Sequence, residues 1–219
     1  MSILDVIGPI IVGPSSSHTA GAVKMGRFAH NYIGKTPQEV KFFLHGSFAE
    51  TYIGHGTDRA LLGGIMGLDL DDPRIKNAFK IAEDVGLKYE FIPADLGDVH
   101  PNTIKIVSIE NDIEYQIIAC SVGAAEIIIT EIDGNTVNLN AKNHTLVIKN
   151  KDEKGALGEI MKLIAFHNIN VANVYLKRLS KALKEAVCVI ELDEEPTLFL
   201  IKDFESNEKI IKCSYIPKI

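Results

Sequence analysis

The feature that most constrains the fold is a change of pattern near residue 142 of this 219-residue chain. From there to the C-terminus, runs rich in β-branched residues alternate with two segments whose apolar residues recur at helical spacing. The predicted strands cover residues 144–149, 171–179, 186–192 and 210–216, and the predicted helices cover residues 156–167 and 196–204. The order of elements is therefore strand, helix, strand, strand, helix, strand.

This order is that of the ferredoxin-like βαββαβ unit, and about 75 residues is a normal length for such a unit. We therefore predict two domains, residues 1–141 and residues 142–219. No flexible or low-complexity segment separates them in the sequence, so the connection between them is expected to be short.

The N-terminal domain is predicted to have helices early and antiparallel strands late. The predicted helices cover residues 19–32 and 73–85, and the predicted strands cover residues 38–45, 88–92, 104–109, 113–121, 125–132 and 135–139. The pair Gly63-Gly64 lies inside a small, apolar segment, and adjacent glycines there indicate close packing against another backbone. The chain as a whole is thus predicted to belong to the α+β class.

Composition excludes several kinds of function. Hydrophobic residues make up 46% and charged residues 24% of the chain, as in ordinary globular proteins. The net charge of −6, without a basic block, argues against a nucleic-acid partner. The apolar start of the chain lacks a basic segment and is interrupted by Asp5 and by Gly13-Pro14. It is therefore not expected to be a signal peptide or a membrane span, and we expect a cytoplasmic protein with no membrane partner.

A stretch of small polar residues, Gly13-Pro14-Ser15-Ser16-Ser17-His18-Thr19, precedes the first predicted helix. Serine and threonine are preferred N-caps, so capping alone is one interpretation. The start of a helix also presents free N–H groups and the positive end of the helix dipole, which suit a carboxylate or phosphate. Three serines and a histidine exceed what a cap requires, so we favour an anion-binding site.

Further histidines lie in polar turns of the N-terminal domain. They belong to His45-Gly46-Ser47, to Gly54-His55-Gly56-Thr57-Asp58 and to His100-Pro101-Asn102. Glycines on both sides leave the imidazole of His55 little covered on an adaptable backbone, which suits a general base. A plain surface histidine in a turn explains the same spacing, and the sequence leaves both interpretations open.

The three cysteines, Cys120, Cys188 and Cys213, lie far apart among β-branched residues. Buried thiols in strands explain all of them. None of them forms the closely spaced pairs of a zinc or iron–sulfur site, so no metal is expected to be bound by this chain.

The C-terminal domain resembles an ACT domain. The resemblance rests on the loop Asp152-Glu153-Lys154-Gly155-Ala156-Leu157 and on the turn Asn168-Ile169-Asn170. It implies self-association through this domain and an amino-acid effector site, for which the candidates are Asp152, Gly155, Ala156, Leu157 and Asn170. Lys154 stands where proline is usual in the family. An ACT domain kept only for dimerisation is the alternative.

The N-terminal domain resembles the beta chain of the bacterial iron–sulfur L-serine dehydratase. The serine stretch and the three histidine motifs occur in the family's order over residues 1 to 141. The resemblance implies an α/β fold with a mixed or antiparallel sheet, like the allosteric substrate-binding domain of some phosphoglycerate dehydrogenases. It also implies a lyase that converts L-serine to pyruvate and ammonia. The required [4Fe–4S] cluster would be ligated by a partner alpha subunit, and a monovalent cation requirement stays open.

With this resemblance, the motifs give candidate roles. The candidates for proton transfer are His18, His55 and His100. The candidates for binding L-serine are Ser15, Ser16, Ser17, Thr19, His45, Gly46, Ser47, Thr57 and Asn102. The sequence does not separate a catalytic chain from a regulatory subunit that only binds serine. A hydrolase using Ser17 and His18 is disfavoured, because no G-x-S-x-G motif is present.

Overall fold

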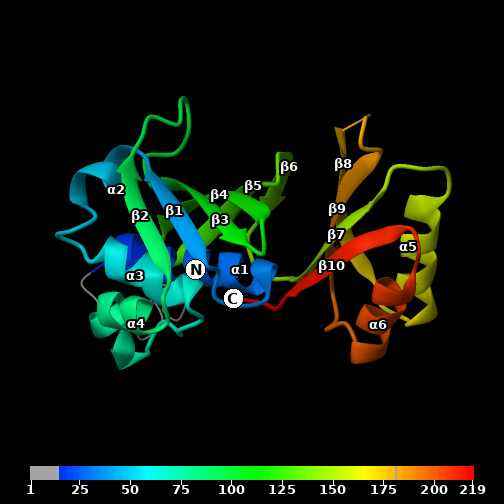
Figure 1. Ribbon diagram of the computed structural model, residues 1–219, viewed down its shortest axis with the longest axis horizontal. Helices are drawn as coiled ribbons and strands as arrows, with labels where there is room; N and C mark the ends of the chain where they lie inside the picture. Colours follow the sequence, from blue (N-terminus) through cyan, green and yellow to red (C-terminus); the bar gives the residue numbers. More distant parts are fainter. Residues whose placement is uncertain (1–14, 181) are drawn as a thin grey trace, which may run out of the picture.

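The computed structural model describes residues 15–180 and 182–219, so Gly13 and Pro14 of the serine stretch lie outside the described residues. The chain is α+β, as predicted, and Figure 1 shows two sheets side by side, each with its own helices. In the part of the chain that the structure describes, no helix is long and apolar enough to cross a membrane.

The first sheet has six strands in the order β2-β1-β3-β4-β5-β6. The strands are β1 Glu39–Leu44, β2 Lys88–Pro93, β3 Thr103–Glu110, β4 Ile113–Gly123, β5 Glu126–Ile132 and β6 Asn135–Leu139. β1 and β2 are parallel, while β1–β3 and all later neighbours are antiparallel, so the sheet is mixed. Phe42 of β1, which is fully buried, pairs with Ile106 of β3 in the middle of the sheet.

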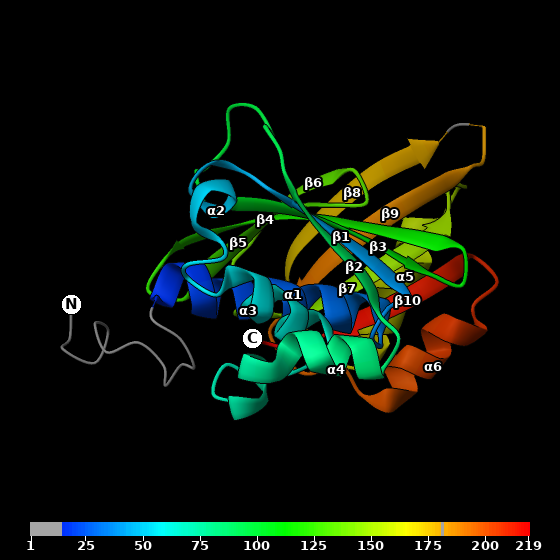
Figure 2. The same cartoon turned by 60° about the vertical axis from the view of Figure 1, so that its left-hand side comes forward.

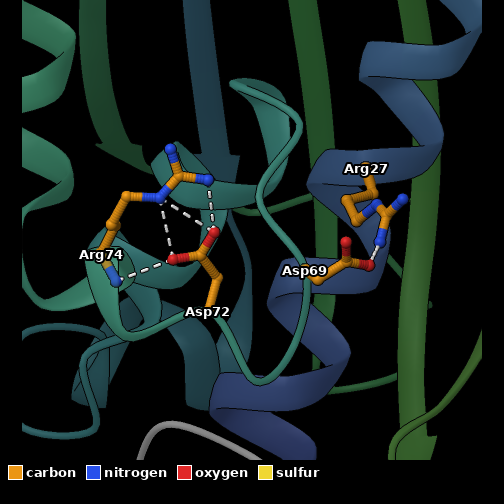
Figure 3. A network of polar contacts seen from close by, with 4 residues as sticks. All are labelled: Arg27, Asp69, Asp72 and Arg74. Atoms are coloured by element: carbon orange, nitrogen blue, oxygen red, sulfur yellow. Dashed lines mark hydrogen bonds and ion pairs between the residues drawn. The ribbon is translucent and has the colours of Figure 1, made fainter.

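Helices cover one face of this sheet (Figure 2). They are η2 Ser16–Ala20, α1 Gly21–Ile33, α2 Gly46–Thr51, α3 Thr57–Ile65, η3 Pro73–Asn77 and α4 Ala78–Asp84. The first differs from the prediction, because residues 16–20 already form a π-helical turn before α1 begins. At the start of the helical segment predicted over residues 73–85, Asp72 accepts a hydrogen bond from the Arg74 N–H at 2.9 Å and forms an ion pair with the Arg74 guanidinium at 2.6 Å (Figure 3).

The helices α1 and α3 run parallel and in backbone contact. A Cβ added to Gly26 of α1 would lie 2.7 Å from the carbonyl oxygen of Leu61, and one added to Gly64 of α3 would collide with the carbonyl oxygen of Val23. The close packing predicted from Gly63-Gly64 is therefore confirmed. An ion pair between Arg27 of α1 and Asp69 joins α1 to the segment after α3 (Figure 3).

The second sheet has four antiparallel strands in the order β10-β7-β9-β8. Its elements are β7 His144–Lys151, α5 Ala156–Phe166, β8 Val171–Ser180, β9 Glu185–Leu192, α6 Leu198–Ser206 and β10 Ile210–Ile216. The predicted order of elements is thus present. Ile160 and Ile164 of α5 and Phe204 of α6 pack with Ile148 and Cys188 in one buried core.

The other face of the second sheet packs against the N-terminal part. Val147, Val189 and Ile216 belong to the core that also contains Phe28 and Tyr32 of α1. At this contact the Tyr32 hydroxyl donates a 2.5 Å hydrogen bond to Asp133 Oδ2, and Lys212 of β10 contacts the hydroxyl of Tyr115. The two sheets are therefore held together by a shared core as well as by the short connection over residues 140–143.

Candidate active site

The serine stretch forms a π-helical turn that leads directly into α1. Ser15 precedes the turn and caps it, because its Oγ accepts a hydrogen bond from the His18 N–H at 3.1 Å. The carbonyl of Ser15 accepts from the N–H groups of Thr19, at 3.0 Å, and Ala20, at 3.3 Å. π-Helical turns are rare and often lie at functional sites. Ser16 and Ser17 are half-buried residues of the turn itself, and the predicted loop-to-helix junction is at Ser15.

His18 lies among residues from three of the predicted motifs. Its Nε2 is 3.0 Å from Ser47 Oγ, and its ring centroid is 4.7 Å from that of His55. The ring of Phe48, which is fully buried, meets the His18 ring edge to face at 5.2 Å. Burial and, to a lesser extent, the charge of His55 lower the pKa of His18. The His18 imidazole is therefore neutral at pH 7.

His55 occupies the turn between α2 and α3. Gly56, its successor, has φ +67°, which glycine adopts without strain. The backbone carbonyl of His55 accepts a 3.0 Å hydrogen bond from Thr19 Oγ1. Within the described residues, the buried Nδ1 of His55 has no hydrogen-bond partner. This nitrogen is available for a ligand or for a proton.

The motifs His45-Gly46-Ser47 and His100-Pro101-Asn102 lie against each other. The Ser47 N–H donates to the Pro101 carbonyl at 2.9 Å, and a Cβ on Gly46, whose φ is +51°, would lie 2.7 Å from that same oxygen. The imidazole of His45 is occupied elsewhere: its Nδ1 accepts from the Leu96 N–H at 3.1 Å and lies 3.7 Å from Asp95 Oδ1. His45 therefore fixes the base of the loop over residues 94–102.

The structure places His100 at the outside of this loop and Asn102 inside it. His100 is exposed, and its Nδ1 accepts from the Asn102 N–H at 3.1 Å. Asn102 is paired with Ser121 of β4, since the Ser121 N–H donates to the Asn102 carbonyl at 3.0 Å and Asn102 Nδ2 donates to the Ser121 carbonyl at 3.4 Å. In the described part of the chain, Asn102 Oδ1 and Ser121 Oγ are buried without a partner.

Ser121 is the residue that the sequence reasoning missed. It is fully buried and lies against the start of α1, because a Cβ on Gly21 would collide with its side chain. The available signal was a serine at the end of the apolar run of β4, in Ala119-Cys120-Ser121. A buried hydroxyl with no partner is costly, so such a residue indicates a functional position.

The start of α3 completes the site. Thr57 is fully buried at the first position of the helix, and its Oγ1 has no partner among the residues that the structure covers. The neighbouring Asp58 accepts a 2.7 Å hydrogen bond from the Arg59 N–H. Burial raises the pKa of Asp58, although Arg59 opposes the shift.

The parallel arrangement of α1 and α3 decides the electrostatics. Their starts lie at the same end of the molecule, joined by the contacts of His18 and Thr19 with His55 (Figure 2). The N-terminus of a helix carries partial positive charge, so two helix starts at one place favour an anion. At the start of α3, the Thr57 N–H already donates to the Tyr52 carbonyl at 2.9 Å and the Arg59 N–H to Asp58 Oδ1 at 2.7 Å. The site can therefore hold a carboxylate beside two imidazoles.

The three cysteines of this chain are poorly suited to ligate an iron–sulfur cluster. Cys120 and Cys188 are buried, and Cys213 is partly buried. Burial raises the pKa of Cys188 and of Cys213 to about 12, which disfavours the thiolate form that cluster ligands take. Over residues 15–180 and 182–219, no group of three or more His, Cys, Asp or Glu is placed to hold a metal ion.

The loop of the C-terminal domain that carries the predicted effector residues lines a separate cavity of about 200 Å³. Asp152, Ala156 and Leu157 line it, and Gly155 has the φ of +84° expected at a tight helix start. Arg178 of β8, also in the lining, forms an ion pair with Asp152.

Asn150 contributes to the same cavity and is buried, with an Oδ1 that has no partner among the described residues. Asn170 does not join this group. Its N–H donates to Glu194 at 2.9 Å and its side chain donates to Asp193 at 2.5 Å.

The fold defines a class of protein: an α+β chain with a six-stranded mixed sheet and a four-stranded antiparallel sheet, in which several polar motifs meet at the start of α1. The family described as serine dehydratase beta chain matches residues 2–168. The chain is 36% identical to the probable L-serine dehydratase beta chain of Bacillus subtilis, over 98% of this chain and 97% of that one. It is 37% identical to the L-serine dehydratase beta chain of Peptoniphilus asaccharolyticus, over the same shares.

The chain therefore belongs to the serine dehydratase beta chain family, and the assignment predicted from the motifs is confirmed. It is also 25% identical to the D-3-phosphoglycerate dehydrogenase of Archaeoglobus fulgidus, over 89% of this chain and 37% of that protein. The family supports a lyase activity for the enzyme to which this chain contributes.

Proposed function

We propose that this chain binds the carboxylate of L-serine and supplies the proton-transfer groups of an L-serine dehydratase, acting with a cluster-bearing alpha chain. The observation that carries the proposal is the juxtaposition of His18 and His55, 4.7 Å apart at the common end of α1 and α3. The names of the two beta-chain relatives support an alpha-chain partner. The [4Fe–4S] ligands are assigned to that partner, because the thiols of this chain do not fit the role.

The reaction requires two groups to leave the substrate. A proton leaves Cα, the hydroxyl leaves Cβ as water after gaining a proton, and the resulting aminoacrylate tautomerises to an imine. Hydrolysis of the imine then gives pyruvate and ammonia. The residues of this chain account for two needs of this sequence, namely orientation of the amino acid and movement of the Cα proton.

Carboxylate binding is assigned to the π-helical turn. Ser15, Ser16 and Ser17 offer hydroxyls at the start of α1, and Thr57 offers another at the start of α3. Backbone N–H groups at the start of the π-helical turn add donors, whereas the Thr57 and Arg59 N–H groups of α3 are already paired within the chain. Asn102 Oδ1, which can only accept, suits the substrate's ammonium group.

Proton transfer is assigned to His55, whose Nδ1 has no hydrogen-bond partner among the residues that the structure describes. His18 has its Nε2 at Ser47 and a lowered pKa, so it stays neutral when His55 takes up a proton. When only one of two close imidazoles is charged, the pair carries one proton more than two neutral rings. A base can take up this extra proton from the substrate and then pass it on. His100 lies on the exposed loop and is the remaining candidate for the general acid. It would protonate the leaving hydroxyl of a substrate bound between this chain and the alpha chain.

We also propose that the C-terminal part is a ferredoxin-like ACT domain and that it binds an amino-acid effector. The strand order β10-β7-β9-β8 and the cavity lined by Asp152, Ala156 and Leu157 support this assignment. Asp152 and Arg178 pair with each other in the lining of this cavity, so a zwitterionic effector would have to replace that ion pair. Self-association through the same part is supported by Phe166, Leu198 and Phe199, exposed by 80%, 79% and 73% on its helices.

The experiment is reconstitution of the chain with an alpha subunit under anaerobic conditions, followed by steady-state kinetics with L-serine. His55→Ala is expected to lower kcat by about 10²–10⁴-fold while the thermal transition stays in place. Ser16→Ala is expected to act mainly on KM, as loss of a binding group does. His167→Gln, a histidine change on α5's C-terminal side, is the matched control and should leave kcat unchanged.

Cluster content must be equal in all samples. A His55→Ala enzyme with normal kcat but a shifted serine dependence would show that the chain is a regulatory subunit and that the catalytic proposal is wrong.

A further inference from the structure

We propose that Thr19 is a positioning residue that sets the place of His55 relative to His18; the inference rests on the proposed role of His55. Thr19 Oγ1 donates a 3.0 Å hydrogen bond to the backbone carbonyl of His55. Thr19 is only 3% exposed, so this bond is shielded from water. The hydroxyl proton is thus committed to the protein, which differs from the substrate-binding role predicted from the sequence.

The local backbone explains why His55 needs such a bond. Gly54 and Gly56 flank it, and glycine restricts the backbone least. The turn is held from one side by the His55 N–H, which donates to the Thr51 carbonyl at 3.1 Å. The bond from Thr19 holds it from the opposite side, across to α1.

The π-helical turn places two consecutive side chains on the same partner. The His18 ring lies 4.7 Å from the His55 ring, while Thr19 binds the backbone of the same residue. Both contacts come from the turn Ser16–Ala20, so the distance between the two rings depends on the distance between this turn and His55. Thr19 fixes that distance directly.

The expected effect follows from the sensitivity of catalysis to position. A misplacement of about 1 Å at a reacting group can cost on the order of 100-fold in rate. We expect Thr19→Val, which keeps the branched shape and removes the hydroxyl, to lower kcat by about 10- to 100-fold with KM changed less than threefold. Thr19→Ser keeps the donor and is expected to retain most of kcat.

The matched control is Thr130→Val. Thr130 of β5 also donates its hydroxyl to a backbone carbonyl, that of Ile118 at 3.2 Å, but it lies in the sheet away from His55. Both variants lose one hydroxyl-to-carbonyl bond, from a buried residue in Thr19→Val and from a half-buried one in Thr130→Val. Thr130→Val is therefore expected to keep wild-type kcat and KM, and an equal loss of kcat in both variants would overturn a specific role for Thr19.

A double-mutant cycle in the reconstituted enzyme separates positioning from substrate contact. If Thr19 acts through His55, Thr19→Val has no further effect on kcat in a His55→Ala background. If the two effects multiply, Thr19 acts on the substrate directly and the positioning proposal is wrong.

A second readout does not depend on catalysis. Histidine ring titrations of the full chain by NMR are expected to show that Thr19→Val changes the titration of His18, since the nearby His55 contributes to its lowered pKa. Identical titrations in wild type and Thr19→Val would overturn the positioning proposal even if His55 is catalytic. If the titration of His18 changes in Thr19→Val but His55→Ala has a normal kcat, Thr19 still positions His55, and the proposed function is wrong.

Discussion

Replacing Gly64 by alanine tests whether backbone contact between α1 and α3 builds the candidate site. The new Cβ would collide with the Val23 carbonyl oxygen and would lie 2.9 Å from the Arg27 nitrogen and from Gly26 Cα, all of them backbone atoms. A flexible side chain could move away, but these atoms move only if the helices separate. We therefore expect Gly64→Ala to destabilise the protein although alanine is the better helix former.

The change in the free energy of unfolding on Gly64→Ala is the difference between a gain in helix propensity and a cost of overpacking. Alanine in place of glycine inside a helix contributes about 1 kcal/mol of stability. Overpacking a well-packed core costs typically about 1–3 kcal/mol, and a contact with backbone belongs at the upper end of that range. The expected net loss is about 1–2 kcal/mol, which corresponds to a fall in Tm of roughly 2–8 °C for a chain of this size.

Gly158→Ala is the matched control. Gly158 is an exposed residue within α5, and an added Cβ would meet no atom within 4 Å. This variant is expected to gain about 0.5–1 kcal/mol from helix propensity alone. The measurement is thermal or urea unfolding of the full chain. If Gly64→Ala were as stable as Gly158→Ala, the close approach of α1 and α3 would be wrong, and with it the geometry that brings His18 to His55.

Two further predictions concern titration. Burial raises the pKa of Asp133 in the folded state, in spite of its hydrogen bonds from Tyr32 and Gln116. The folded protein then binds more protons than the unfolded chain. The contribution of Asp133 to stability is therefore complete below pH 3.8 and falls as the pH rises through the raised pKa. Urea unfolding at several pH values should show this loss in wild type and not in Asp133→Asn. Because the thiols of Cys188 and Cys213 have pKa values of about 12, the native chain should resist iodoacetamide at pH 8, and rapid alkylation of either would contradict their burial.

The sequence by itself determined the elements and the family. Hydrophobic periodicity identified most of the helices and strands, since a helix or strand needs an apolar face of fixed period. It did not identify α2 and α3, which were not predicted as helices. The four polar motifs predicted the serine dehydratase beta chain family by their residue types and order, and the match of the family over residues 2–168 confirms that prediction. The π-helical turn was not predicted, because an extra residue in a helical turn leaves no periodic signature over five residues.

Only the tertiary structure decided which motif residues meet. His18 and Ser47 are 29 positions apart, and their contact follows from the packing of α1, α2 and α3 on the first sheet. Packing also turned His45 toward Leu96 and placed Ser121 beside Gly21, neither of which has a local signal. It likewise covered the second face of the C-terminal sheet with the N-terminal core, through Val147 and Val189. Local patterns report which face of an element is apolar, whereas the partner of that face depends on the shapes of segments distant in the sequence.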